Sequence, residues 1–250
     1  MRKFGLIGYP LSHSFSKKYF TEKFFSENIT DCSYDNYPLK KLDEFRELVV
    51  SDDELCGLNI TIPYKSEIIR FLDVIDPEAE EIGAVNVIKI RRPGGKIKLF
   101  GYNSDVTGIR DTLLPYIGDN VRNALVLGTG GSSRAVCHVL KKFGLQVDLV
   151  SRERKPGILV YSDVDSEILD NAQLIINTTP LGMFPNTESR PEINYRRLNR
   201  KHILFDLVYN PEITSFLRMG AEQGCLIISG VKMLHSQAEK AWEIWNNDSI

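Results

Sequence analysis

The sequence has no long apolar run. None of its apolar stretches approaches the roughly 18 residues that a membrane-spanning helix requires. The first segment, "MRKFGLIGYP", carries basic side chains, but Gly8, Tyr9 and Pro10 interrupt its apolar stretch before it reaches the length of a signal-peptide core. These absences predict a cytoplasmic protein with no membrane partner.

The sequence also has no large excess of charge of one sign and no cluster of cysteines. The chain carries 31 basic and 33 acidic residues, and a net charge of −2 argues against a nucleic-acid partner, which would need a basic excess. The cysteines lie far apart, without a C-x-x-C pair or a histidine at zinc-ligand spacing: Cys32, Cys56, Cys137 and Cys225. We therefore expect reduced thiols and no metal site.

What the sequence does contain is an alternation of short apolar strands with amphipathic helical segments. This pattern is typical of an α/β fold with largely parallel sheets. One series begins with a strand at 3–9, and a second begins with the strand that precedes a glycine turn at 128–131. Between them, the segment 104–117 reads as a helix rather than a flexible linker. The sequence thus predicts two α/β domains with a cleft between them.

The sequence predicts two particular helices in the first series. Residues 16–28 place Phe20, Phe24 and Phe25 at helical spacing, which predicts that all three enter the core. Residues 66–75 read as a second, short helix.

The stretch "LVLGTGGSSR" follows a buried-type strand and opens a helix. Gly128, Gly130 and Ser133 occupy the three positions of G-x-G-x-x-G, with a small serine in place of the last glycine. The first glycine permits a tight turn, the second lets the backbone approach a pyrophosphate, and the helix N-terminus attracts its charge. The alternative is an ordinary strand-to-helix turn, but its context favours dinucleotide binding.

The next strand ends in "VSRERK" and lacks the acid that would hold the ribose 2′-hydroxyl of NAD. Asp148 lies inside the strand, too early for that role, and Arg152, Arg154 and Lys155 follow the strand end. Because an arginine fork suits a phosphate, these residues favour a 2′-phosphate and hence NADP. A solvated charged loop is the alternative.

The stretch "NITIPYK" is an apolar strand with polar residues on one face. Alternation sends Leu58, Ile60 and Ile62 to one face and Asn59 and Thr61 to the other. Buried parallel strands are usually apolar on both faces, so the two polar side chains require polar partners. We expect Pro63 to end the strand, with Lys65 just past its carboxyl end, where ligands of open α/β sheets bind.

Three further polar groups fall at expected strand ends: "SHSFS" at 12–16, Asn86, and "NSD" at 103–105. Each has an ordinary explanation as a helix cap or a turn residue. Together with Lys65, they would form a pocket rich in hydroxyl and amide groups, which suits a small polyhydroxylated acid.

With these motifs, the sequence closely resembles the shikimate dehydrogenase family, whose members reduce 3-dehydroshikimate with NADPH. The resemblance rests on motifs in family order over nearly the whole chain: "GYPLSHSFS", "GLNITIPYK", "GAVN", "GYNSD", "LGTGGSSR", "VSRER", "INTTPLGM", "FDLVYNP" and "GVKMLHSQAEKAWEIW".

The resemblance implies a role for each matching residue. Lys65 and Asp105 would be the catalytic pair. The substrate residues would be Ser14 and Ser16 at the carboxylate, Asn59, Thr61, Asn86, Asp105 and Gln237 at the ring hydroxyls, and Tyr209 nearby. The cofactor residues would be Gly128, Gly130, Gly131, Ser132, Arg152, Arg154, Lys155, Thr178, Gly230 and Met233.

The resemblance also implies a domain division. The last helix would return to the first domain, so that residues 1–102 and 231–250 form a substrate-binding domain with a mixed, mainly parallel sheet. Residues 103–230 would form a Rossmann-type NADP-binding domain. The protein would be a monomer or homodimer.

One stretch departs from the family. The segment "KPGILVYSDVDSEILDNA" is shorter than the family pattern and holds one brief helical stretch, which bears on the preference for NADP over NAD. Three alternatives stay open: quinate as an additional substrate, a folate-linked dehydrogenase of similar build, and a non-catalytic sensor of the pathway acid.

Overall fold

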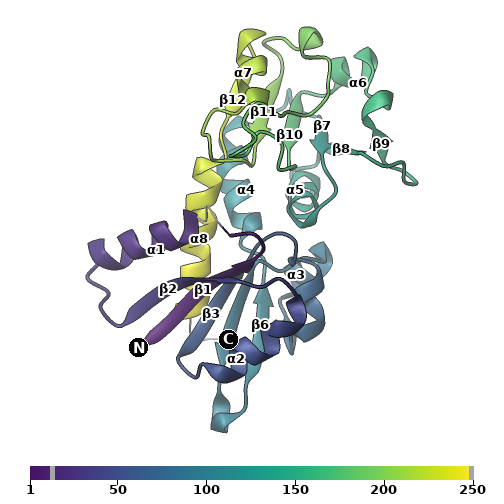
Figure 1. Cartoon of the computed structure of the whole chain (residues 1–250). Helices are drawn as coiled ribbons and strands as arrows, with labels where there is room; N and C mark the ends of the chain where they lie inside the picture. Colours follow the sequence, from purple (N-terminus) through teal and green to yellow (C-terminus); the bar gives the residue numbers. More distant parts are fainter. Residues whose placement is uncertain (12–14, 248–250) are drawn as a thin grey trace. The chain divides into compact units, whose positions relative to one another are not determined.

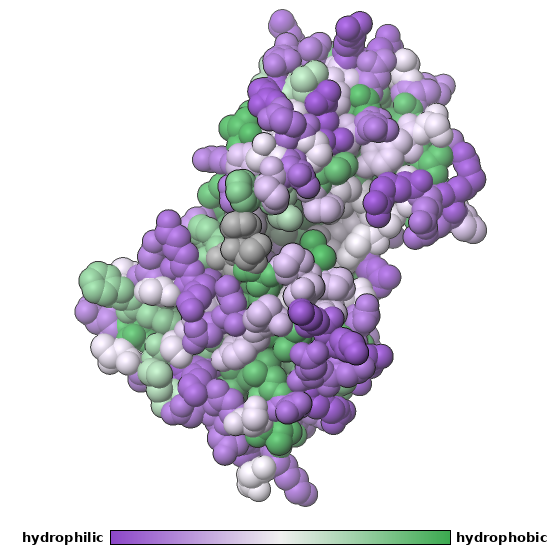
Figure 2. Space-filling model, in the orientation of Figure 1, coloured by the Kyte–Doolittle hydropathy of each residue, from purple (hydrophilic) through white to green (hydrophobic). Residues whose placement is uncertain are grey.

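The structure is a computed structural model that describes residues 1–11 and 15–247, and it confirms the α/β class (Figure 1). The chain forms two compact units, Met1–Ser104 with Ala238–Ile250, and Asp105–Gln237. No helix within the described residues is both long and apolar enough to cross a membrane. The visible surface of each unit is mainly polar, with small apolar areas (Figure 2).

The first unit is built on a mixed sheet of six strands in the order β2-β1-β3-β5-β6-β4. Its strands are β1 (Arg2–Gly8), β2 (Cys32–Pro38), β3 (Leu55–Ile60), β4 (Val74–Ile75), β5 (Val87–Arg91) and β6 (Lys98–Tyr102). Only β5 runs against the others, because it pairs antiparallel with both β3 and β6 while the remaining pairs are parallel. The carboxyl ends of β1 and β3 therefore lie at one edge of the sheet.

Helices cover both faces of this sheet. One core includes side chains of α2 (Phe45–Ser51) and α3 (Pro77–Ile82), and the other includes side chains of α1 (Phe15–Ser26) and of the last turns of α8 (Val231–Asn246). Trp245 of α8 is buried in the second of these cores.

Trp245 stacks on Phe4 at 4.7 Å between ring centroids and donates its indole N–H to the Ile88 carbonyl at 3.0 Å. This packing requires a glycine at position 57, because a Cβ there would overlap the indole ring.

Two expectations for the first unit were wrong. Phe20 and Phe24 are buried, but Phe25 is 87% exposed, because one residue past Phe24 the helix has turned about 100° away from the sheet. Residues 66–75 form a 3₁₀ helix at Glu67–Phe71 and then strand β4, not one helix. The segment at 73–75 pairs with the edge of β6 instead of continuing as a helix, and the Asp73 N–H donates to the Leu99 carbonyl at 3.0 Å.

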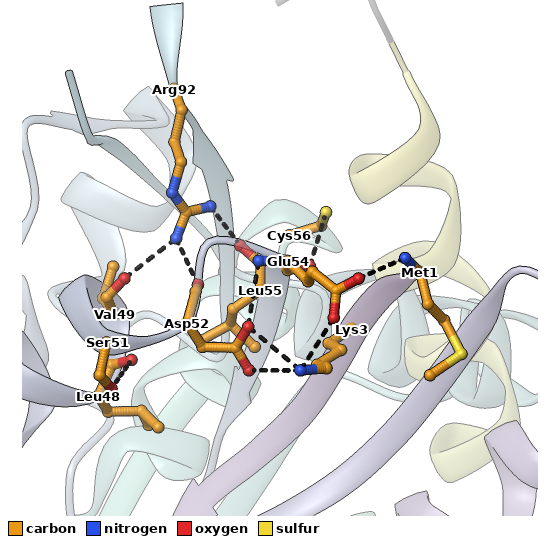
Figure 3. A network of polar contacts seen from close by, with 10 residues as sticks. All are labelled: Met1, Lys3, Leu48, Val49, Ser51, Asp52, Glu54, Leu55, Cys56 and Arg92. Atoms are coloured by element: carbon orange, nitrogen blue, oxygen red, sulfur yellow. Dashed lines mark hydrogen bonds and ion pairs between the residues drawn. The ribbon is translucent and has the colours of Figure 1, made fainter. Parts of the chain in front are cut away.

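Arg92 links the β5–β6 hairpin by hydrogen bonds to the segment that runs from α2 to the start of β3 (Figure 3). Its guanidinium donates to the backbone carbonyls of Val49, Asp52 and Leu55 at 2.7–3.0 Å. Lys3 on β1 forms an ion pair with the Asp52 carboxylate of the same connection at 3.1 Å. These contacts hold the amino-terminal end of β3, so they stabilise the sheet at the end opposite Asn59.

The second unit is built on a fully parallel sheet of six strands in the order β12-β11-β10-β7-β8-β9. Its strands are β7 (Asn123–Leu127), β8 (Gln146–Ser151), β9 (Leu159–Val160), β10 (Leu174–Asn177), β11 (Ile203–Asp206) and β12 (Leu226–Ile228). Its helices are α4 (Asp105–Leu113), α5 (Gly131–Lys142), α6 (Ser166–Asn171) and α7 (Ser215–Glu222), and α8 begins in it.

Numbered within the unit, this order is 3-2-1-4-5-6, which is that of a Rossmann fold. The order reverses between β7 and β10, and a dinucleotide binds at such a point. The short segment after the basic loop still supplies the third strand, β9, followed by the six-residue helix α6.

Candidate functional site

The centre of the polar cluster in the first unit is Asn86, just before β5, whose side chain is 3% exposed. Its backbone joins two strands, because its carbonyl accepts from the Ile60 N–H at 2.8 Å and its N–H donates to the Tyr102 carbonyl at 3.0 Å. Its Oδ1 accepts from the Ser104 N–H at 2.7 Å, and its Nδ2 donates to the Ser104 hydroxyl at 3.1 Å. The amide is thus fixed in one orientation.

Asn59 lies beside Asn86 and is half-buried. Its Oδ1 accepts from the Tyr34 hydroxyl at 2.8 Å, and its Nδ2 faces the Asn86 carbonyl at 3.4 Å. Burial raises the pKa of Tyr34 well above its usual range, and Ser16, near the start of α1, interacts with the same hydroxyl and opposes the shift. The structure therefore brings three of the expected substrate residues, Ser16, Asn59 and Asn86, into one connected network.

Lys65 is held close to the same segment through its backbone. Its carbonyl accepts from the Val85 N–H at 2.7 Å, and the buried Asn103 side chain donates to the neighbouring Ala84 carbonyl at 2.8 Å. The Lys65 side chain is half-buried. Residues 84–86 thus connect the backbone of Lys65 to the end of β6, which precedes Asp105.

The strand before Lys65 is shorter than expected. β3 ends at Ile60 rather than at Pro63, and Ile62 is 58% exposed. The backbone stays extended for one more pair, since the Thr61 N–H donates to the Ile7 carbonyl at 2.8 Å, and the Thr61 side chain is half-buried. The polar face of this segment begins at Asn59, as alternation predicts.

Of the remaining expected substrate or catalytic residues, Ser14 lies outside the described residues and three belong to the second unit. Asp105 opens α4 in the second unit with 1% exposure, and Tyr209 and Gln237 are half-buried residues of that unit. Their roles stay predictions.

The glycine turn of the second unit has the tight geometry that its sequence predicts. Gly128 directly follows β7 with φ +116°, and a Cβ there would lie 2.5 Å from the Thr178 hydroxyl oxygen. The Thr178 hydroxyl donates to the Leu127 carbonyl at 2.7 Å, and the Ser133 hydroxyl donates to the Gly128 carbonyl at 2.7 Å. Thr178 follows β10, so this turn lies at the reversal point of the sheet.

Helix α5 begins directly after this turn. Gly130 is its N-cap, and a Cβ on Gly130 would meet no atom within 4 Å. Gly131 and Ser132 form its first turn and are half-buried. Small residues here leave room for a phosphate to approach the helix N-terminus, which carries a partial positive charge. The arrangement fits a dinucleotide pyrophosphate.

The basic segment after β8 is exposed, but its members differ. Arg154 pairs with Asp163 at 2.8 Å, and the backbone of Lys155 forms a bridge with Ile158. Arg152 lies near Tyr161, whose pKa is raised by burial while the Arg152 charge opposes the shift. A 2′-phosphate would have to compete with Asp163 for Arg154, whereas the structure describes no such carboxylate pair for Arg152.

The other two expected cofactor residues, Gly230 and Met233, lie where two backbone segments approach closely. Gly230 is buried, and a Cβ there would lie 2.5 Å from the Leu207 carbonyl oxygen. Met233 on α8 is 6% exposed, and a Cβ on Gly108 of α4 would lie 2.6 Å from its carbonyl oxygen. Within residues 1–11 and 15–247, no group of three or more His, Cys, Asp or Glu side chains could hold a metal ion.

Sequence reasoning missed a buried acid in the second unit. Asp206 ends β11 with 0% exposure and accepts hydrogen bonds from the Thr214 hydroxyl at 2.6 Å, the Val208 N–H at 3.0 Å and Asn177 Nδ2 at 3.0 Å. Burial raises the pKa of Asp206 to about 6, although these hydrogen bonds oppose the shift. The signal was present in "ILFDL", where an acid interrupts an apolar strand.

Tyr34 was also missed as a site residue, because a tyrosine inside a strand is typical of ordinary core packing.

The fold and these sites define an α/β protein of the dinucleotide-binding class. Its Rossmann-type sheet carries a glycine turn at the reversal point, and a separate α/β unit carries a polar network at its strand ends. Comparison with known proteins identifies the family. Residues 6–88 match the family described as the shikimate dehydrogenase substrate binding domain.

Curated relatives cover almost the whole chain. The shikimate dehydrogenase (NADP(+)) of Methanococcus aeolicus is 36% identical over 96% of this chain and 90% of its own. That of Clostridium beijerinckii is 37% identical over 98% of this chain and 92% of its own. The chain therefore belongs to the shikimate dehydrogenase family.

Solved structures agree with this assignment. Shikimate dehydrogenase 1 from Peptoclostridium difficile is 35% identical, with a TM-score of 0.85 over 100% of this chain and 93% of its own. The Thermus thermophilus shikimate 5-dehydrogenase in complex with NADP(H) and shikimate is 29% identical, with a TM-score of 0.85 over 98% of this chain and 94% of its own.

Proposed function

We propose that this protein is an NADP-dependent shikimate dehydrogenase, which reversibly reduces 3-dehydroshikimate to shikimate in the chorismate pathway to aromatic amino acids. The observation that carries the proposal is the network of Ser16, Asn59 and Asn86 at the strand ends of the first unit. Hydroxyl and amide groups suit a ligand with several hydroxyls, because each can donate and accept hydrogen bonds.

On this proposal the substrate is bound mainly by the first unit. Ser14 and Ser16 hold the carboxylate, and Tyr209 lies near the substrate. The ring hydroxyls are bound by Asn59, Thr61, Asn86, Asp105 and Gln237. The half-buried state of Asn59 and Thr61 supports this assignment, since each is held by the fold and keeps part of its surface accessible.

Lys65 and Asp105 form the catalytic pair of the proposal. The bound dinucleotide supplies or accepts the hydride. In the reducing direction, the Lys65 ammonium stabilises the negative charge that develops on the ketone oxygen and donates a proton to it. In the oxidising direction, neutral Lys65 accepts the hydroxyl proton. Asp105 orients Lys65 in both directions.

The cofactor is assigned to the second unit. Gly128, Gly130, Gly131 and Ser132 receive the pyrophosphate, Thr178 also binds the cofactor, and Gly230 and Met233 lie near the nicotinamide. Arg152, Arg154 and Lys155 bind the 2′-phosphate. Since Arg154 is already paired with Asp163, we assign the larger share of the NADP preference to Arg152.

The proposal extends to organisation and location. Residues 1–102 with 231–250 serve as the substrate-binding domain, and residues 103–230 serve as the NADP-binding domain. The enzyme works in the cytoplasm as a monomer or homodimer. Four cysteines without a disulfide are in keeping with a reducing compartment.

A substrate and cofactor panel tests the proposal. The purified protein is assayed with shikimate, quinate and methylene-tetrahydrofolate, each with NADP and with NAD, by following formation of the reduced nicotinamide. We expect shikimate with NADP to give the highest kcat/KM.

Turnover only with the folate substrate would assign a folate-linked dehydrogenase. Thermal stabilisation by shikimate without any turnover would assign a sensor. Either result would overturn the proposed function.

A further inference from the structure

Tyr34 lies between two residues of the proposed substrate site. It belongs to β2, its side chain is 4% exposed, and its ring stacks on Phe20 at 4.6 Å between centroids. Its hydroxyl contacts Asn59 on one side and Ser16 on the other. Packing of the ring thus fixes the place of the hydroxyl.

A backbone carbonyl determines the direction of the hydrogen bonds in this chain. The Asn86 carbonyl can only accept, so the Asn59 atom that faces it at 3.4 Å must be Nδ2. Oδ1 of Asn59 then faces Tyr34, and the Tyr34 hydroxyl must donate its proton to it. Because a hydroxyl has one proton, the Tyr34 oxygen can only accept from Ser16.

This order has a consequence for the ligand. Asn59 directs its oxygen toward Tyr34 and one N–H toward the Asn86 carbonyl, so the donor that it offers a ligand is its second N–H. Without Tyr34, the amide could rotate and present its oxygen instead. A ring hydroxyl would then have to donate to the Asn59 oxygen instead of accepting from the Asn59 N–H, which changes the direction of the hydrogen bond.

We propose that Tyr34 is a positioning residue of the substrate site, which holds the Asn59 amide so that Asn59 donates a hydrogen bond to a ring hydroxyl oxygen of the substrate. This inference rests on the proposed function. It adds a residue that touches no substrate atom and acts through Asn59.

The test is Tyr34→Phe, which removes only the hydroxyl and keeps the ring in its aromatic packing. We expect the KM for shikimate to rise about 3- to 10-fold, the range for one lost hydrogen bond, while the KM for NADP changes less than about 2-fold. Tyr37→Phe is the matched control. Tyr37 lies on the same strand but on the opposite face of the sheet. Removal of the Tyr37 hydroxyl should therefore leave the KM for shikimate and the KM for NADP unchanged.

A double-mutant cycle separates positioning from a general structural role. In an Asn59→Ala background, Tyr34→Phe should change the KM for shikimate by less than about 2-fold, because the residue through which it acts is gone. A rise as large as in the wild-type background would overturn the inference. So would an unchanged KM for shikimate in Tyr34→Phe, or an equal rise in both KM values. Absence of shikimate turnover in the wild type would instead refute the proposed function, and the inference with it.

Discussion

The buried carboxyl of Asp206 should give the protein a measurable pH dependence of stability. In the unfolded chain its pKa is near 3.8, and in the folded protein burial raises the pKa to about 6. A shift of roughly two units corresponds to about 3 kcal/mol. The folded state therefore holds this proton more tightly than the unfolded state does. The stabilisation is fully present below about pH 3.8 and is lost as the pH rises through about 6.

Asp206→Asn isolates this contribution, because the variant has no titrating group at that position. The free energy of unfolding is measured by urea denaturation between pH 3.5 and 8 for both proteins. The difference, wild type minus variant, should fall by about 3 kcal/mol across this range and become flat above about pH 7. A constant offset from the substitution itself does not affect this change.

A half-buried carboxyl, that of Asp163, provides the control with the opposite sign. The pKa of Asp163 is lowered by the Val160 N–H and the Arg154 guanidinium, so the difference between wild type and Asp163→Asn should increase with pH. A difference curve for Asp206 that is flat, or that rises with pH, would refute the assignment of Asp206 as a destabilised buried carboxylate.

Three further predictions follow from single contacts. Gly128→Ala should raise the KM for NADP more than about 10-fold and cost about 1–3 kcal/mol in unfolding free energy, because its φ of +116° strains any side chain; kinetics and urea denaturation check it. Arg152→Ala should lower the NADP over NAD ratio of kcat/KM more than Arg154→Ala does, because Arg154 is paired with an aspartate; equal losses would contradict this. Gly57→Ala should destabilise the protein by about 1–3 kcal/mol, since its Cβ overlaps Trp245, as a lower thermal midpoint would show.

Much of the site was predictable because its residues break a local pattern. Asn59 is polar in an apolar strand, and Gly128 stands where a strand must turn sharply into a helix. The structure provides what each of them requires, since Tyr34 and Asn86 satisfy the Asn59 amide and Thr178 crowds Gly128.

Other features depend on tertiary contacts that the local sequence does not encode. Residues 66–75 have a helical apolar pattern, but the edge of β6 offers backbone partners that a local pattern cannot show. Phe25 was misplaced because its spacing fits a wide helix face, and only the sheet decides how wide the buried face is. Tyr34 looks like any core tyrosine until its two partners are known.

If this protein oxidises shikimate with NADP through Lys65, removing the Lys65 side chain should abolish most of its turnover. Formation of NADPH from shikimate and NADP is followed for the wild type and for Lys65→Ala. We predict clear turnover by the wild type, and in Lys65→Ala a kcat about 10²–10⁴-fold lower with a much smaller change in shikimate affinity. Turnover by Lys65→Ala within a few-fold of the wild type would show that Lys65 is not the catalytic acid and base.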